Sequence, residues 1–139
     1  MPNLTQTIKR IESTEMTRLF KTLYGTEPEL LEKQRQRYKK LIAEYEQKFG
    51  DADVRLFSTP GRTEIGGNHT DHNNGRVLAA SVNLDSVAVA SKSEDNVITI
   101  YSEGFSEAFQ VKLDDLSLKQ QEQGTTTGII RGIAARFKE

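Results

Sequence analysis

The sequence predicts an α+β fold, with N-terminal helices followed by a mostly antiparallel or mixed sheet and a C-terminal helix. Apolar residues recur at helical spacing before residue 50, and β-branched, alternating segments dominate from there to residue 113. Helical spacing then returns near the end of the chain. At 139 residues we expect a single domain, with a helical lead at 1–50 and a β-region plus helix at 51–139.

The helical lead is expected to hold two helices. Apolar side chains from Ile8 to Leu23 are spaced as on one helix face, and Gly25 stands where this first helix would end. A second helix is expected to begin with Pro28 in its first turn and to stop at Gly50. Their apolar stripes predict packing against each other or against a sheet.

The β-region is expected to hold a short strand at 54–58 and one long strand or two joined strands at 77–91. Two further segments alternate between apolar and polar residues, at 96–102 and 108–113. A final helix is expected over 125–137, where isoleucines and a phenylalanine share one face.

Composition argues against several classes of function. The net charge is -1, from 19 basic and 20 acidic residues, and no part of the chain is basic enough to favour nucleic acid as a partner. The apolar runs are too short to span a membrane. The chain contains no cysteine, so it has no disulfide framework, which fits a cytoplasmic location.

A polar cluster, PGRTEIGGNHTDHNNG at 60–75, lies between the first two strand candidates. It carries an arginine, two histidines and two carboxylates, which is more than a turn needs. Gly66 and Gly67 permit a sharp turn or a close approach to a ligand, and the Asn-Asn-Gly at 73–75 favours positive φ and a tight reversal. We therefore expect 68–72 to lie on a short constrained loop between strands.

The polar groups of this cluster suit a sugar. The carboxylate of Asp71 can accept two neighbouring hydroxyl protons, Asn68 both donates and accepts, and His69 does either according to its tautomer. Arg62 can stabilise negative charge that develops on an oxygen. The alternative is a structural turn whose Asp and Asn side chains bind backbone amides.

Two other ligands are less well supported by the residues. His69 and His72 could join Glu64 in a two-histidine, one-carboxylate metal set, but they lie in a predicted loop, and we expect no metal. The Gly-Gly pair of the cluster matches no nucleotide-binding loop. The Gly-Thr-Thr-Thr at 124–127 could offer amides to an anion, but a threonine N-cap for the last helix is favoured.

The segment PGRTEIGGNHTDHNNGRVLAAS resembles the galactokinases of the GHMP small-molecule kinase superfamily. Their signature runs approximately PGR-x-N-L-I-G-E-H-T-D-Y-N-x-G, followed by a V-L-P-A-A-type strand. Nine residues match in register: Pro60, Gly61, Arg62, Gly67, His69, Thr70, Asp71, Asn73 and Gly75. Similarity extends to 49–50, 101–103 and 128–135, so the resemblance implies the N-terminal part of a GHMP-kinase domain.

The resemblance also implies transfer of the ATP γ-phosphoryl group, with Mg²⁺, to the anomeric hydroxyl of galactose. The motif then belongs to the sugar site, with Arg62 as a catalytic residue near the reacting hydroxyl. Asn68, His69 and Asp71 would contact other ring hydroxyls. These roles suit phosphoryl transfer, which depends on positioning and charge stabilisation.

The sequence departs from the family pattern at several positions. Glu64 replaces an asparagine, Ile65-Gly66 replaces Leu-Ile, and His72 replaces a tyrosine. Asn68 replaces a glutamate, which removes a sugar-facing carboxylate and eases repulsion of an acidic sugar. Galacturonate is therefore a competing substrate.

The family's phosphate-binding loop and catalytic aspartate do not occur in these 139 residues. The resemblance therefore implies a sugar-binding portion that is inactive alone and binds neither ATP nor Mg²⁺ by itself. We expect it to self-associate, because the apolar face that further residues of the family's domain would cover is exposed. A non-catalytic sugar-binding or sensor protein, or a structural module with a decorated turn, remain the alternatives.

Overall fold

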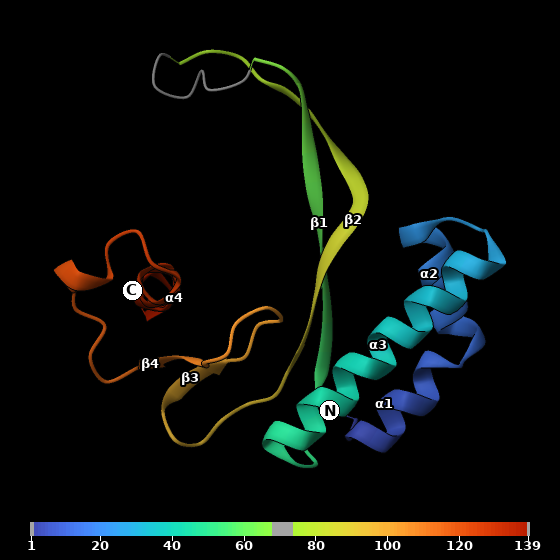
Figure 1. The fold of residues 1–139 in the computed structure, drawn as a ribbon, viewed down its shortest axis with the longest axis horizontal. Coiled ribbons are helices and arrows are strands. Elements are labelled where there is room, and N and C mark those ends of the chain that lie inside the picture. Colours follow the sequence, from blue (N-terminus) through green and yellow to red (C-terminus); the bar gives the residue numbers. More distant parts are fainter. Residues whose placement is uncertain (1, 68–73, 139) are drawn as a thin grey trace. The chain divides into compact units, whose positions relative to one another are not determined.

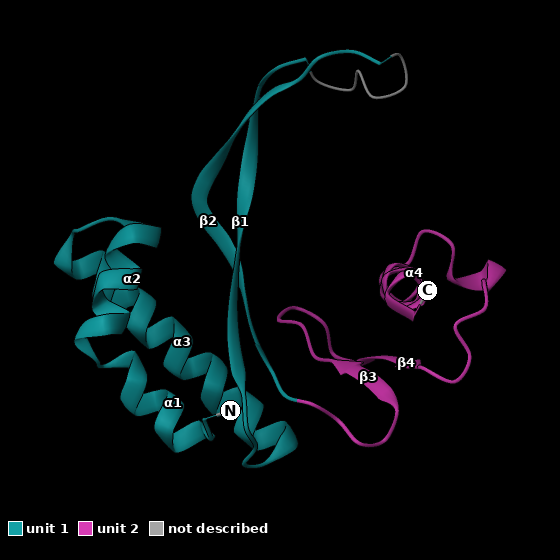
Figure 2. Ribbon diagram, turned by 180° about the vertical axis from the view of Figure 1, so that it is seen from behind, with its two compact units in different colours: residues 1–91 teal, residues 92–139 magenta. Residues whose placement is uncertain are grey.

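The computed structural model describes residues 2–67 and 74–138, and the chain divides into two compact units (Figures 1 and 2). Unit 1 is Met1–Ser91 and unit 2 is Lys92–Glu139. The α+β prediction is confirmed: N-terminal helices precede two antiparallel two-stranded sheets and a C-terminal helix. No helix among the described residues is long and apolar enough to cross a membrane.

Unit 1 begins with three helices where the sequence predicted two. The prediction of one helix before Gly25 is wrong, because the Ser13 side chain accepts a hydrogen bond of 3.1 Å from the Met16 amide and begins a new helix. Gly25 and Gly50 end the later helices with positive φ, as predicted. The helices are α1 (Leu4–Ile11), α2 (Thr14–Tyr24) and α3 (Pro28–Phe49).

The core of unit 1 lies where these helices meet the first strands. The long helix α3 contributes most to it, because its apolar residues recur along one face. Leu56, Val87 and Val89 pack against this core from the sheet. The fully or nearly buried apolar residues are Leu4, Ile11, Phe20, Tyr24, Leu31, Tyr38, Ile42, Tyr45 and Val54.

The sheet of unit 1 is a long antiparallel hairpin of β1 (Arg55–Gly66) and β2 (Leu78–Ala90). One long strand or two joined strands were predicted at 77–91, and the structure has one long strand there. The first strand was predicted too short, because it continues through Pro60 into the polar cluster while still pairing with β2. We call the half of the hairpin beside α3 the near half, and the half that extends beyond the helices toward residue 67 the far half. Figure 2 shows both halves. Residues 62–66 and 78–81 in that far half are all exposed.

Unit 2 pairs β3 (Val97–Ile100) with β4 (Phe109–Lys112) and continues through a 3₁₀ turn (Gln120–Glu122) to α4 (Thr126–Lys138). These elements confirm the strands predicted at the two alternating segments, 96–102 and 108–113, and the predicted last helix. The predicted N-cap is confirmed as Thr125, whose hydroxyl accepts a hydrogen bond of 3.2 Å from the Gly128 amide.

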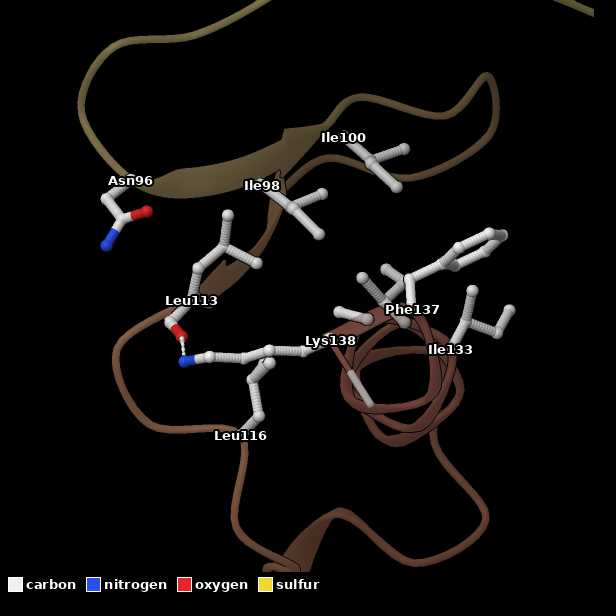
Figure 3. A pocket seen from close by; sticks show the side chains of 10 residues that line it. Asn96, Ile98, Ile100, Leu113, Leu116, Ile133, Phe137 and Lys138 are labelled. Atoms are coloured by element: carbon white, nitrogen blue, oxygen red, sulfur yellow. Dashed lines mark hydrogen bonds between the residues drawn. The ribbon is translucent and has the colours of Figure 1, made fainter.

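An apolar hollow of about 580 Å³ lies between β3, the segment that follows β4, and α4 (Figure 3). Ile98 and Ile100 line it from the sheet, and Ile133 and Phe137 line it from the helix. At its edge the ammonium group of Lys138 donates to the Leu113 carbonyl at 3.3 Å. The apolar face of α4 is thus only partly covered within unit 2.

Candidate functional site: a hairpin that presents a polar loop

The predicted site residues divide between the described strand and the loop. Arg62 lies in β1 opposite Ser81, with an exposed side chain. Asn68, His69 and Asp71 lie outside the described residues, so their predicted roles stay predictions. The structure does describe the backbone on both sides of the loop, and this backbone explains why the cluster needs its glycines.

The ends of the loop meet at a narrow neck. Gly66 is the last residue of β1 and pairs with Leu78. Gly67 follows with φ of +87°, and a Cβ there would lie 2.9 Å from the Cα of Val77 and clash with the Arg76 carbonyl. Only glycine satisfies both demands. The close contact at Gly67 is thus with the chain's own backbone, and the close approach to a ligand stays a prediction.

The other side of the neck uses a second left-handed residue. Asn74 has φ of 56°, a conformation that asparagine tolerates better than most side chains. The predicted positive φ in the Asn-Asn-Gly segment is thus confirmed at this position. Residues 68–73 thus lie in the chain between two residues of positive φ, Gly67 and Asn74.

A bulge interrupts the hairpin at the start of the signature. Pro60 pairs with Asp85 and Arg62 with Ser81, so the three residues 82–84 of β2 lie opposite Gly61 alone. A Cβ on Gly61 would lie 3.1 Å from the Leu84 carbonyl oxygen. Bulges bend a ribbon and redirect the side chains beyond them. Here the bulge separates the half that packs on the helices from the half that carries Arg62.

A buried carboxylate anchors the base of this bulge. The Asp85 side chain is 4% exposed and accepts hydrogen bonds from Arg37 Nη1 at 2.5 Å, Tyr24 Oη at 2.6 Å and Ser58 Oγ at 2.5 Å. Arg37 also donates from Nη2 to the Asp85 carbonyl at 2.8 Å. Because the single Tyr24 proton goes to Asp85, the Tyr38 hydroxyl, 2.9 Å away, donates to Tyr24.

The electrostatics of this cluster favour an ionised Asp85. Burial by itself raises the pKa of the Asp85 carboxyl, but the hydrogen bonds from Ser58, Tyr24 and Arg37 together outweigh it and hold the pKa below its ordinary value. Burial and the hydrogen bond to Asp85 raise the pKa of Tyr24, so its hydroxyl stays a donor. The sequence analysis missed Asp85, although an acidic residue within the apolar run VNLDSVAVA was a usable signal.

The described residues contain no group of three histidine, cysteine or carboxylate side chains placed to hold a metal ion. The histidines of the metal alternative, His69 and His72, fall outside them. Glu64 is described and lies exposed in β1 opposite Ala79. Among the described residues, no hydrogen bond or ion pair joins the guanidinium of Arg62 to another group, and Arg62 is exposed in β1.

Comparison with known proteins finds a family signature that spans this hairpin. The galactokinase galactose-binding signature matches residues 43–92, which include the last turns of α3 and all of β1 and β2. This segment is homologous to galactokinases. The galactokinase signature therefore covers the neck, the bulge and Asp85 as well as the polar loop.

Several bacterial galactokinases show the same relationship. The galactokinase of Staphylococcus saprophyticus is 35% identical over 92 residues, covering 63% of this chain and 24% of that protein. The galactokinase of Lactococcus lactis subsp. cremoris is 36% identical over 99 residues, covering 70% and 25%. That of Exiguobacterium sibiricum is 39% identical over 75 residues, covering 52% and 19%.

The chain spans about a quarter of the length of the galactokinases it matches. No solved structure matches the chain. The homology therefore concerns only a part of those proteins.

Proposed function

We propose that this chain is the sugar-binding part of a galactokinase-type enzyme and that it holds galactose at the loop 68–73. The observation that carries the proposal is the match of the galactose-binding signature to the β1–β2 hairpin. The neck at Gly67 and the bulge at Gly61 support it, because they constrain the two strand ends from which the polar loop projects.

The proposed contacts follow from the chemistry of a hexose. Asp71 accepts protons from two ring hydroxyls, while Asn68 and His69 bind others. Arg62 lies in β1, four residues before the strand ends, and stabilises negative charge on the hydroxyl that reacts. Its exposed position on β1 supports this role.

For the whole enzyme we propose transfer of the ATP γ-phosphoryl group to the anomeric hydroxyl of galactose, with Mg²⁺. The described residues of this chain do not fit an ATP site. The glycine-led turn before α4 uses its Thr125 hydroxyl to cap the helix, and Gly66 and Gly67 belong to a hairpin and open no helix. We therefore assign this segment to the sugar alone.

Galacturonate is a second candidate sugar, because Asn68 stands where the family signature has a glutamate. A neutral amide repels the carboxylate of an acidic sugar less than a glutamate does. Arg62, four residues before the end of β1 at Gly66, would add attraction for that carboxylate if both lie on one side of the bound sugar.

A sugar panel tests the proposal directly. Thermal shift is measured for the 139-residue chain with galactose, galacturonate and glucose, and repeated for Asp71→Ala and for Glu94→Ala, an exposed carboxylate in unit 2. We expect galactose or galacturonate to raise the melting temperature of wild type and Glu94→Ala, and to leave Asp71→Ala unchanged. A shift that survives Asp71→Ala, or no shift with any sugar, would contradict the proposal.

A further inference from the structure

We propose that Asp85 is a positioning residue for the sugar loop: with Tyr24, Arg37 and Ser58 it forms a clamp that fixes the direction of the far half of the hairpin. This group is called the Asp85 clamp below. The consequence for sugar binding rests on the proposed function, whereas the consequence for the hairpin does not.

The far half of the hairpin has little else to hold it. Residues 62–66 and 78–81 are exposed, and a two-stranded ribbon without a covered face is marginally stable and free to twist. The near half is different, because Leu56, Val87 and Val89 pack on the helical core. The direction of the loop must therefore be set at the junction between the halves.

The Asp85 clamp lies at that junction. Asp85 is the first paired β2 residue after the three residues, 82–84, that lie opposite Gly61. Its donors come from three different elements, with Tyr24 at the end of α2, Arg37 in α3 and Ser58 in β1. Arg37 binds the backbone carbonyl of Asp85 as well as its carboxylate. Both the side chain and the main chain of β2 are thus held where the register changes.

The chemistry of the clamp is better suited to fixing the position of β2 than to stabilising the fold. An apolar cluster of the same size would bury its surface without the cost of removing a carboxylate from water. Apolar contacts, however, tolerate sliding, whereas three directed hydrogen bonds to one carboxylate do not. A slip of β2 by one residue would turn Asp85 to the opposite face and leave Arg37 without its partner.

The chain offers a matched control at the other end of β2. Tyr45 in α3 donates a hydrogen bond of 2.6 Å to the hydroxyl of Ser91, the residue after β2, so it also joins a helix to this segment through one tyrosine hydroxyl. Tyr24 and Tyr45 are both nearly buried. The contact of Tyr24 lies at the bulge, and the contact of Tyr45 lies beyond the near half.

The test compares Asp85→Asn, Tyr24→Phe and Ser58→Ala with Tyr45→Phe in the 139-residue chain. Amide hydrogen exchange is followed for 62–66 and 78–81 and, separately, for α1 to α3. We expect the three clamp variants to speed exchange in the far half by about tenfold while the helices change little. Tyr45→Phe should leave the far half as in wild type. Galactose binding by calorimetry should weaken by about tenfold in the clamp variants only.

The outcomes separate the two claims. If wild type binds no galactose but the clamp variants loosen the far half alone, the clamp stands and the proposed function falls. If all variants exchange and bind as wild type does, the clamp is wrong and the function stands. Equal acceleration in helices and hairpin would make Asp85 merely structural and overturn the proposal, as would an unprotected far half in wild type. Ser58→Ala removes one hydroxyl only, so it serves if Asp85→Asn does not fold.

Discussion

At the residue scale, the strictest demand in the hairpin falls on Gly67. The position combines a left-handed backbone with direct contact to the main chain at Arg76 and Val77. The sequence predicted that this glycine permits a sharp turn or a close approach, because the freedom of a glycine backbone is a local property. The neighbouring Gly66 was given the same role, yet it lies in the strand with open space around its Cβ position.

This difference gives a paired prediction. Gly67→Ala should destabilise the neck by about 1–2 kcal/mol from the left-handed backbone alone, with more from the displaced strand. Gly66→Ala should have a small effect. Amide exchange at Val77 and Leu78 measures both variants. Equal exchange in the two variants would show that the neck does not form as described.

Asp85 could not be predicted in the same way, since its partners are distant in sequence. Tyr24 is 61 positions away, Arg37 is 48 and Ser58 is 27. Local pattern places β2 correctly but says nothing about which side chains from other elements will meet one of its residues. The polar loop was recognisable because its residues are contiguous in sequence. The clamp was not recognisable, since only folding brings its residues together.

The ionised state of Asp85 predicts a dependence of stability on pH. Its folded pKa lies below the unfolded value, so its contribution is complete above about pH 4 and is lost as pH falls through the folded pKa. The free energy of unfolding, measured with urea, should therefore fall more steeply between about pH 5 and pH 2 for wild type than for Asp85→Asn. Glu44→Gln, which removes a surface ion pair with Lys40, should follow wild type. Parallel curves for wild type and Asp85→Asn would refute the contribution.

At the element scale, the first helical segment shows how one cap divides an apolar stripe. Spacing from Ile8 to Leu23 is compatible with one helix, but the Ser13 hydroxyl competes for a backbone amide and starts α2 anew. Hydrophobic periodicity does not register this competition. The stop at Gly25 was predictable because glycine supplies the positive φ that ends the helix.

The cap is testable by substitution. Ser13→Ala should lower the free energy of unfolding by about 1 kcal/mol, because the Met16 amide loses its partner. Thr22→Ala, at an exposed position inside α2, should change it by less than about 0.5 kcal/mol. Chemical denaturation followed by circular dichroism compares them. A continuous helix through residue 13 would predict that Ser13→Ala stabilises the chain.

The length of β1 was misjudged for a related reason. Proline and glycine commonly end strands, so the pattern stops at Ser58. In the structure Pro60 stands at the bulge and Gly61 gives room for the opposing residues, so pairing resumes at Arg62. The strand-breaking residues mark the bulge inside the hairpin.

At the scale of the whole molecule, the sequence predicted the class and order of elements but not the partners of each strand. The alternation in 96–102 and 108–113 identifies strands, but it is the same whether these strands join the sheet of β1 and β2 or form a second sheet. The structure pairs β1 with β2 and β3 with β4 in separate units. Pairing depends on chain reversals and buried contacts that a two-residue period does not encode.

Both units expose apolar side chains, which predicts association. Leu78 and Ile65 in the hairpin are more than half exposed, and Phe137 on α4 is 89% exposed. We expect the apparent mass by light scattering to rise with concentration, because association covers this surface. Phe137→Ser should reduce the rise, and Lys9→Ser, on the surface of α1, should not. A constant monomer mass at high concentration would contradict this expectation.

The central claim is that the signature hairpin holds the sugar. The most direct measurement is titration of the ¹⁵N-labelled chain with galactose while backbone amide signals are followed. The account predicts saturable shifts that gather between Arg62 and Val77, with the same titration of Asp71→Ala leaving those signals unmoved. Saturable shifts centred on another part of the chain, or no shifts with either galactose or galacturonate, would contradict it.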